Sequence, residues 1–167
     1  MNDNYDSDME DGYNEVLDKA LAFAKLAHAG QTKKMGEDKG KPYMIHPFRV
    51  FQRILAEGMS ICIYNYNVIG PASLLHDSIE DGYINGVKVT AQTLLDAGFS
   101  QDVVDVVSTL SRDKDKETYF DFIMRVKKNP YAVVIKIADI EDDMIDLEEG
   151  SLKDNYRLAH YILSKRI

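Results

Sequence analysis

Apolar residues recur at every third or fourth position along most of this chain, which is the spacing of one buried face on an α-helix. The first such stretch covers residues 13–29 and ends at Gly30. Further stretches with this spacing cover residues 46–57, 68–79, 91–97, 101–110, 119–128, 132–147 and 152–165. Thr90, Ser100 and Ser151 stand at the starts of three of them, where hydroxyl side chains cap helices. The pattern predicts helices over these ranges.

Strand signals are sparse. Only IYNYNVI (residues 63–69) and GVKVT (residues 86–90) suggest extended structure, and both are short. With 167 residues, one domain is the expected organisation. We therefore predict an all-α fold, a single compact bundle of about seven or eight helices over residues 13–167. Residues 1–12 are acidic and polar and are predicted to form a flexible lead-in.

The composition of the chain limits the classes of ligand and the cellular location that can be expected for it. The formal net charge is −8, which argues against a nucleic-acid or membrane surface but leaves room for a small anionic ligand in a locally basic pocket. Cys62 is the single cysteine and lies between two isoleucines, so we predict a buried structural thiol in a reducing compartment. The start of the chain lacks a signal peptide and no apolar run reaches membrane-spanning length, which favours a cytoplasmic location.

The stretch SLLHDSIEDG (residues 73–82) carries the most concentrated chemistry. His76 and Asp77 are neighbours, and neighbours on a helix diverge by about 100°, so both reach one ion only at a helix end or against a groove. His46 begins another predicted helix, and Asp139 follows an apolar run in which an unpaired charge would be costly. Two imidazoles and two carboxylates suit a divalent metal. The alternative is a structural polar cluster.

Glu80 and Asp81 follow the predicted metal pair by one helical turn. They therefore project over the same patch, where carboxylates can hold or deprotonate a water molecule. A solvated acidic helix end is the alternative interpretation. The acidic run 141–149 is most simply a solvated face, apart from Asp143. Tyr43 and His28 are interpreted as packing residues.

Several segments together resemble one known family. HAGQTKKMG, KPYMIHP, SLLHDSIEDG and VIKIADIEDDM occur in the order and with the gaps of the HD-domain hydrolases of the RelA/SpoT type. That family includes small stand-alone enzymes that hydrolyse guanosine tetra- and pentaphosphate, (p)ppGpp. The resemblance covers roughly residues 15–165, and the H-D-x-x-E-D element is its most specific part.

The resemblance implies a role for each matching position. The family's metal ligands fall on His46, His76, Asp77 and Asp139, and its usual ion is manganese, although another divalent metal is possible. Its catalytic acidic pair falls on Glu80 and Asp81. Its substrate-contacting positions fall on Lys33, Lys34, Lys136, Asp143, Arg157 and Tyr161. In that family, water activated at the metal attacks the 3′-pyrophosphate and releases pyrophosphate with GDP or GTP.

Two positions depart from the family pattern. Lys33 stands where arginine is frequent, which keeps the charge but loses a bidentate contact to phosphate. Asp143 stands where the short members have asparagine, which places a negative charge near an anionic ligand. The alternatives are therefore a hydrolase of another nucleotide or NADPH, and a non-catalytic nucleotide-binding module. A small-molecule nucleotide is the expected partner, with no nucleic acid and no membrane. The sequence leaves the oligomeric state open.

Overall fold

The computed structural model describes residues 7–56 and 65–165, with side chains from residue 15 onward. Its helices and strands in chain order are α1 (Ser7–Ala27), α2 (Ile45–Ala56), α3 (Tyr66–Leu75), α4 (Ser78–Asp81), β1 (Tyr83–Ile84), β2 (Val87–Lys88), α5 (Ala91–Asp96), α6 (Gln101–Leu110), α7 (Tyr119–Val126), α8 (Pro130–Asp146) and α9 (Ser151–Ser164). Helices dominate, and β1 and β2 form a small antiparallel pair. The predicted all-α fold is confirmed.

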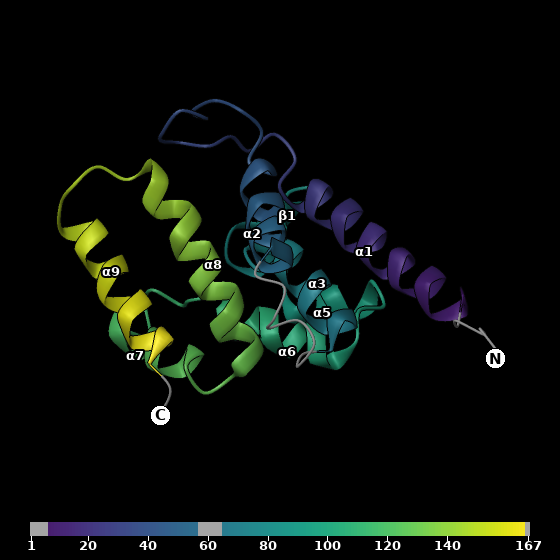
Figure 1. Ribbon diagram of the computed structural model, residues 1–167. Coiled ribbons are helices and arrows are strands. Elements are labelled where there is room, and N and C mark those ends of the chain that lie inside the picture. The colour runs from purple at the N-terminus through teal and green to yellow at the C-terminus, as the bar shows by residue number, and fades with distance from the viewer. Residues whose placement is uncertain (1–6, 57–64, 166–167) are drawn as a thin grey trace.

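The helices pack around α3. Figure 1 shows α1 on one side of the molecule, α8 and α9 side by side on the other, and α2 and α3 between them. Helix α3 contacts α1, α2 and α6, and α8 contacts both α2 and α9. All residues from Val68 to Leu75 are buried, because this apolar helix has neighbours on every side. The last residue of α3 is therefore held in the core, directly before the candidate metal pair.

Helix boundaries follow local side chains where caps are present. Thr90 accepts from the Thr93 backbone N–H and Ser100 accepts from the Val103 backbone N–H, as predicted for N-caps. The prediction for Ser151 is wrong: Gly150 holds the cap position and Ser151 is the first helical residue. Helix α1 begins at Ser7, within the segment predicted to be a flexible lead-in.

The strand signals have opposite outcomes. Within GVKVT, Val87 and Lys88 pair with β1, so a short strand is present. In IYNYNVI the described residues 66–69 belong to α3, which Asn65 caps by accepting from the Asn67 backbone N–H. The apolar contacts of α3 outweigh the strand propensity of its aromatic and β-branched residues. Cys62 lies outside the described residues.

No helix in the described part of the chain combines the length and the apolar character needed to cross a bilayer.

Candidate metal site and its surroundings

The predicted helix 68–79 is broken at the His76–Asp77 step. Helix α3 ends at Leu75, His76 is its C-cap, and Asp77 precedes the single turn of α4. The break removes the divergence that a continuous helix would impose on neighbouring side chains. Nε2 of His76 consequently lies 3.1 Å from Oδ2 of Asp77. Of the two arrangements that would let both side chains reach one ion, a helix end or a groove, the helix end is present.

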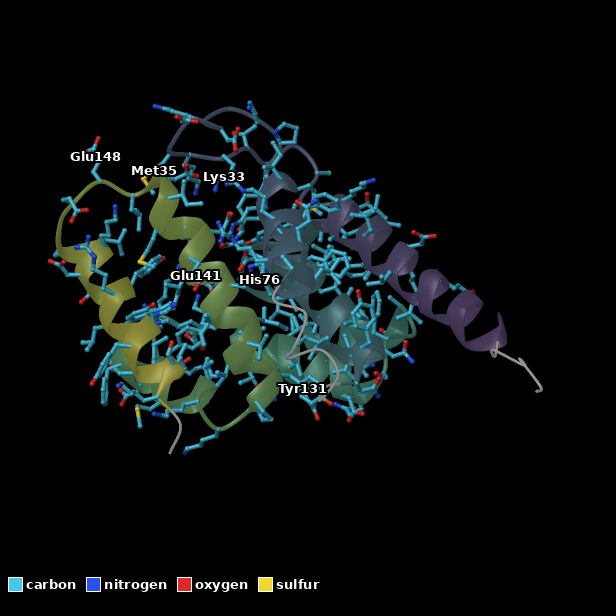
Figure 2. The ribbon with its side chains drawn as sticks, in the orientation of Figure 1. Lys33, Met35, His76, Tyr131, Glu141 and Glu148 are labelled. Carbon is cyan, nitrogen blue, oxygen red and sulfur yellow. The ribbon has the colours of Figure 1, made fainter. Side chains whose placement is uncertain are left out.

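His46 and Asp139 complete the cluster from two other helices. His46 stands in the first turn of α2, and its Nε2 lies 3.0 Å from Oδ1 of Asp139 on α8. The same Asp139 oxygen lies 3.6 Å from Nε2 of His76. Ligand atoms of His46, His76 and Asp139 all lie within 4.8 Å of one another, and Oδ2 of Asp77 is 3.7 Å from Nε2 of His46. Figure 2 shows His76 in the interior between α2 and α8.

Both imidazoles are oriented by contacts at their other nitrogen. Nδ1 of His76 lies 2.8 Å from the Ser73 carbonyl oxygen, and Nδ1 of His46 lies 2.8 Å from Oδ2 of Asp142. A hydrogen on each Nδ1 leaves the Nε2 lone pairs directed at the carboxylates. Nε2 of His76 is buried and has no hydrogen-bond partner. A divalent ion among these four groups would satisfy that nitrogen, so the donor set fits a metal.

The carboxylates, imidazoles and one lysine of the cluster shift one another's pKa values. Burial alone would lower the pKa of His46, but the Asp139 and Asp142 carboxylates raise it to about 9. Burial alone would raise the pKa of Asp139, but Lys136 and the two imidazoles hold it well below its usual range. Nζ of Lys136 lies 2.6 Å from Oδ2 of Asp139. Lys136 therefore contacts the cluster itself, which places it at the predicted site.

The acidic half of α8 is not the solvated face that the sequence suggested. Asp142 is completely buried and also lies 2.9 Å from Nε of Arg49. Asp146 is nearly buried against Lys33 at 3.0 Å. Asp142 follows Asp139 by three residues and Asp146 follows it by seven, so all three share one helix face. That spacing is the signal that could have identified both.

Asp143 lies beside the cluster, one turn after Asp139 on α8. Its Oδ1 is 3.8 Å from Nδ1 of His46, too far for a hydrogen bond. Burial and the neighbouring Asp139 raise the pKa of Asp143 to about 6. The structure therefore places this departure from the family pattern next to a candidate metal ligand.

Glu80 and Asp81 lie on α4, beyond the metal pair. Oε2 of Glu80 accepts from the Arg112 backbone N–H at 3.0 Å, and Oε1 lies 3.0 Å from Nζ of Lys114. Asp81 is exposed as a whole residue, but its carboxyl group is partly desolvated, and this desolvation together with the Asp77 and Glu80 carboxylates raises its pKa. Both residues line a cavity of about 590 Å³, and Asp81 also lines a second cavity of about 430 Å³. Glu80 is thus held by the loop after α6 and is not a solvated helix end.

The two loop lysines differ in their surroundings. The side chains of Lys33 and Lys34 both line the cavity of about 430 Å³, together with Asp81. Lys33 is buried and its charge is matched by Asp146, whereas Lys34 is exposed. Figure 2 shows Lys33 close to the C-terminal end of α8. Of the pair, Lys34 is the one presented to a ligand in this cavity.

Arg157 and Tyr161 are not brought to the metal cluster by the contacts they make. Arg157 pairs with Glu149 at 2.8 Å and with Asp154 at 3.1 Å on the surface of α9. Tyr161 is 60% exposed, and Nζ of Lys165 lies over its ring. Their nucleotide contact stays a prediction.

Tyr43 is a site residue that sequence reasoning missed. Its hydroxyl donates to Oδ2 of Asp77, although the sequence was interpreted as giving it a packing role. Its ring contacts His28, whose Nδ1 lies 2.8 Å from Oε1 of Gln31. The Gln31 amide in turn donates to the Asp81 carbonyl oxygen at 2.7 Å. The segment after α1 therefore supports both ends of the Asp77–Asp81 stretch.

The fold and the cluster define an all-α domain with a candidate site for one divalent metal ion. Known proteins share this fold. No protein-family model matches the chain. A solved structure described as that of a metazoan ortholog of SpoT, which hydrolyses ppGpp and plays a role in starvation responses, has a TM-score of 0.67. It is 23% identical, and the match covers 89% of this chain and 83% of that one. This likeness shows the fold.

Comparison with curated protein sequences identifies particular relatives that this chain resembles. The chain is 34% identical over 149 residues to the guanosine-3′,5′-bis(diphosphate) 3′-pyrophosphohydrolase of Vibrio cholerae, covering 83% of this chain. It is 34% identical over 151 residues to the bifunctional (p)ppGpp synthase/hydrolase SpoT of Escherichia coli, covering 84%. It spans about a fifth of the length of these relatives, 19% of each. The resemblance expected from the motifs is confirmed.

Proposed function

We propose that this chain is a divalent-metal-dependent hydrolase that removes the 3′-pyrophosphate of ppGpp or pppGpp and leaves GDP or GTP. The observation that carries the proposal is the convergence of His46, His76, Asp77 and Asp139 from separate elements, with both imidazole Nδ1 atoms engaged elsewhere. The similarity to relatives named as 3′-pyrophosphohydrolases supports the substrate. We propose Mn²⁺ as the ion and the cytoplasm as the location.

The reaction needs a polarised water molecule and a proton acceptor. A divalent ion held by the four ligands would supply positive charge to the water and to the phosphate oxygens. Water adds to the phosphorus attached to the 3′-oxygen, the bond between that phosphorus and the 3′-oxygen breaks, and the 3′-oxygen takes up a proton that balances the one lost by the water. Glu80 and Asp81 would hold the water and accept its proton, which general base catalysis requires.

The substrate end of the proposed site includes the segment after α1 and part of α8. Lys34 would meet phosphate in the cavity of about 430 Å³, while Lys33 is engaged with Asp146. Lys136 would act through Asp139 by balancing its charge. Arg157 and Tyr161 are proposed to contact the nucleotide on the resemblance alone.

Hydrolysis of another nucleotide or of NADPH is the second candidate. Asp143 favours it, because a carboxylate 3.8 Å from His46 sits where a phosphate-rich ligand would meet negative charge. The pairing of Lys33 with Asp146 also favours the second candidate, because Asp146 neutralises one positive charge that could otherwise bind phosphate. Both observations concern the substrate and leave the metal set intact.

The test is hydrolysis of radiolabelled ppGpp by the purified chain with Mn²⁺, beside a panel of nucleotides and NADPH. Release of pyrophosphate from ppGpp supports the proposal, and release of phosphate only from another member supports the second candidate. His76→Ala and Asp139→Ala should each abolish Mn²⁺ binding and turnover. Glu141→Gln is the matched control, because Glu141 lies on α8 but its carboxylate faces His160 at 2.9 Å. Tight nucleotide binding without hydrolysis under any divalent ion would indicate a binding module.

A further inference from the structure

The loop between α6 and α7 fixes the Glu80 carboxylate. This loop, residues 111–118, supplies both groups that contact Glu80: the Arg112 backbone N–H at 3.0 Å and Nζ of Lys114 at 3.0 Å. Both of these contacts come from the loop, and neither comes from a side chain of α4, the helix on which Glu80 lies. The orientation of this candidate catalytic carboxylate therefore depends on where the loop lies.

The loop forms one turn of its own, in which the Lys116 and Glu117 backbone N–H groups donate to the Asp113 carbonyl oxygen at 3.1 Å, but none of its side chains is buried. Its sequence is SRDKDKET, and residues 113–116 are exposed. Without a buried apolar side chain, such a segment depends on hydrogen bonds for its position.

Arg125 on α7 provides them at both ends of the loop. Its NH1 donates to the Thr109 carbonyl oxygen at 2.8 Å, and its NH2 donates to the Ser111 carbonyl oxygen at 3.1 Å. These carbonyls lie at the C-terminal end of α6, where they have no partner within the helix. NH2 and Nε also donate to the two oxygens of Glu117, at 2.6 Å and 3.1 Å. One guanidinium thus ties the beginning of the loop to its end.

Glu117 continues the connection toward Glu80. Its backbone carbonyl accepts from NH2 of Arg112 at 3.2 Å, and it is the backbone N–H of Arg112 that binds Glu80. The Arg125 guanidinium also packs on the Phe122 ring at 5.3 Å, which limits its motion. Lysine could not replace it, because an ammonium group lacks the planar fork that reaches four acceptor oxygens of three residues at once.

We propose that Arg125 is a positioning residue for hydrolysis: it holds the 111–118 loop so that the Arg112 backbone N–H keeps Glu80 in its reactive orientation. The kinetic test of this proposal rests on the proposed function, because it requires that the chain hydrolyse a nucleotide. Its structural readout, the protection of backbone amides, is independent of any activity.

The first experiment is amide hydrogen exchange on Arg125→Gln, with Lys127→Gln as the matched control. Lys127 follows α7 and its Nζ donates to the Ile162 carbonyl oxygen on α9, away from the loop. Exchange in peptides covering residues 109–118 and 77–82 should become at least about tenfold faster in Arg125→Gln and stay unchanged in Lys127→Gln. Unchanged exchange in Arg125→Gln overturns the inference.

The second experiment measures kcat, KM and Mn²⁺ affinity. Arg125→Gln should lower kcat about 10- to 100-fold, part of the contribution of a positioned acid or base, while KM and Mn²⁺ affinity stay within about twofold. In a Glu80→Gln background the same change should cost less than about twofold, because the group that it positions is already altered. An equal loss of kcat in both backgrounds overturns the inference, as does a loss that disappears when kcat is calculated per folded molecule.

Further variants keep the test decisive if Arg125→Gln does not fold. Arg125→Lys retains the charge and the packing on Phe122, and Glu117→Gln removes the charged acceptor from the other side; both should reproduce the loss of kcat. Full kcat in both overturns the inference. If the wild-type chain hydrolyses no nucleotide, the proposed function fails, and the hydrogen-exchange result alone decides whether Arg125 holds Glu80.

Discussion

Asp142→Asn tests whether the second contact of His46 contributes to metal affinity. Asp142 is completely buried, and its Oδ2 lies 2.8 Å from Nδ1 of His46. Asparagine preserves the shape and one acceptor oxygen, so the substitution isolates the negative charge. Loss of a carboxylate behind a ligating imidazole typically weakens metal binding about 10- to 100-fold, or about 1.4–2.7 kcal/mol. We expect a decrease in Mn²⁺ affinity in that range.

Stability also changes, because Asp142 lies 2.9 Å from Nε of Arg49. Removing one partner of a fully buried ion pair costs about 3–5 kcal/mol, but Arg49 is partly exposed and keeps its 2.6 Å contact with Asp38. We therefore expect the free energy of unfolding to fall by about 1–3 kcal/mol. Isothermal titration with Mn²⁺ and chemical denaturation of the metal-free protein measure the two effects separately.

Asp146→Asn is the matched control for the same two measurements. Asp146 lies on the same helix and near the same arginine, 3.6 Å from Arg49 NH2, but pairs with Lys33 instead of His46. It should lower stability while leaving Mn²⁺ affinity unchanged. The reasoning is refuted if Asp142→Asn binds Mn²⁺ like the wild type, or if both variants lose affinity equally.

Three further predictions follow from other contacts. Tyr43→Phe removes the donor to Asp77 and should lower Mn²⁺ affinity about tenfold by titration, without a change in the far-ultraviolet circular dichroism spectrum. Mn²⁺ at about 100 times its Kd should stabilise the protein by about 2.7 kcal/mol and raise Tm by about 5–10 °C, an effect that EDTA reverses and that His76→Ala should lack. Gly36→Ala should lower the free energy of unfolding by about 1–3 kcal/mol, because Gly36 has φ +75° and an added Cβ would overlap the Asp146 side chain. Gly40 has φ +85° and open space around it, so Gly40→Ala should lose only the stability that its backbone conformation costs an alanine. Equal losses of unfolding free energy in Gly36→Ala and Gly40→Ala would refute the steric reasoning.

Sequence reasoning succeeded where the determining interactions are local. Thr90 and Ser100 cap the helices that follow them, since the partner of each hydroxyl lies three residues away. The continuous helix predicted over residues 68–79 is wrong, but helical geometry did limit His76 and Asp77 to a helix end or a groove, and a helix end is present.

The parts that could not be predicted depend on partners distant in the sequence. Asp142 is buried because Arg49 and His46, on another helix, compensate its charge. The acidic run 141–149 offered no indication of these partners. Tyr43 contacts Asp77 across 34 positions, and no local pattern marks that pairing. In each case tertiary contacts decide the role of a side chain whose residue type suggests a simpler one.

The candidate metal ligands lie in the core, at the break between α3 and α4, whereas the proposed substrate contacts lie on surface segments. The sequences of these two regions can therefore change at different rates in evolution. His76 follows the buried residues 68–75 of α3, and His46 and Asp139 lie on helices packed beside it, so we expect exchange of an ion at the proposed site to require opening of the core. The lysine proposed to meet the substrate, Lys34, lies instead on the segment after α1, at the protein surface. Mutation in that segment is therefore expected to alter the proposed substrate contacts and leave the candidate metal ligands in place, and Lys33, which pairs with Asp146, is a position where such a change can begin.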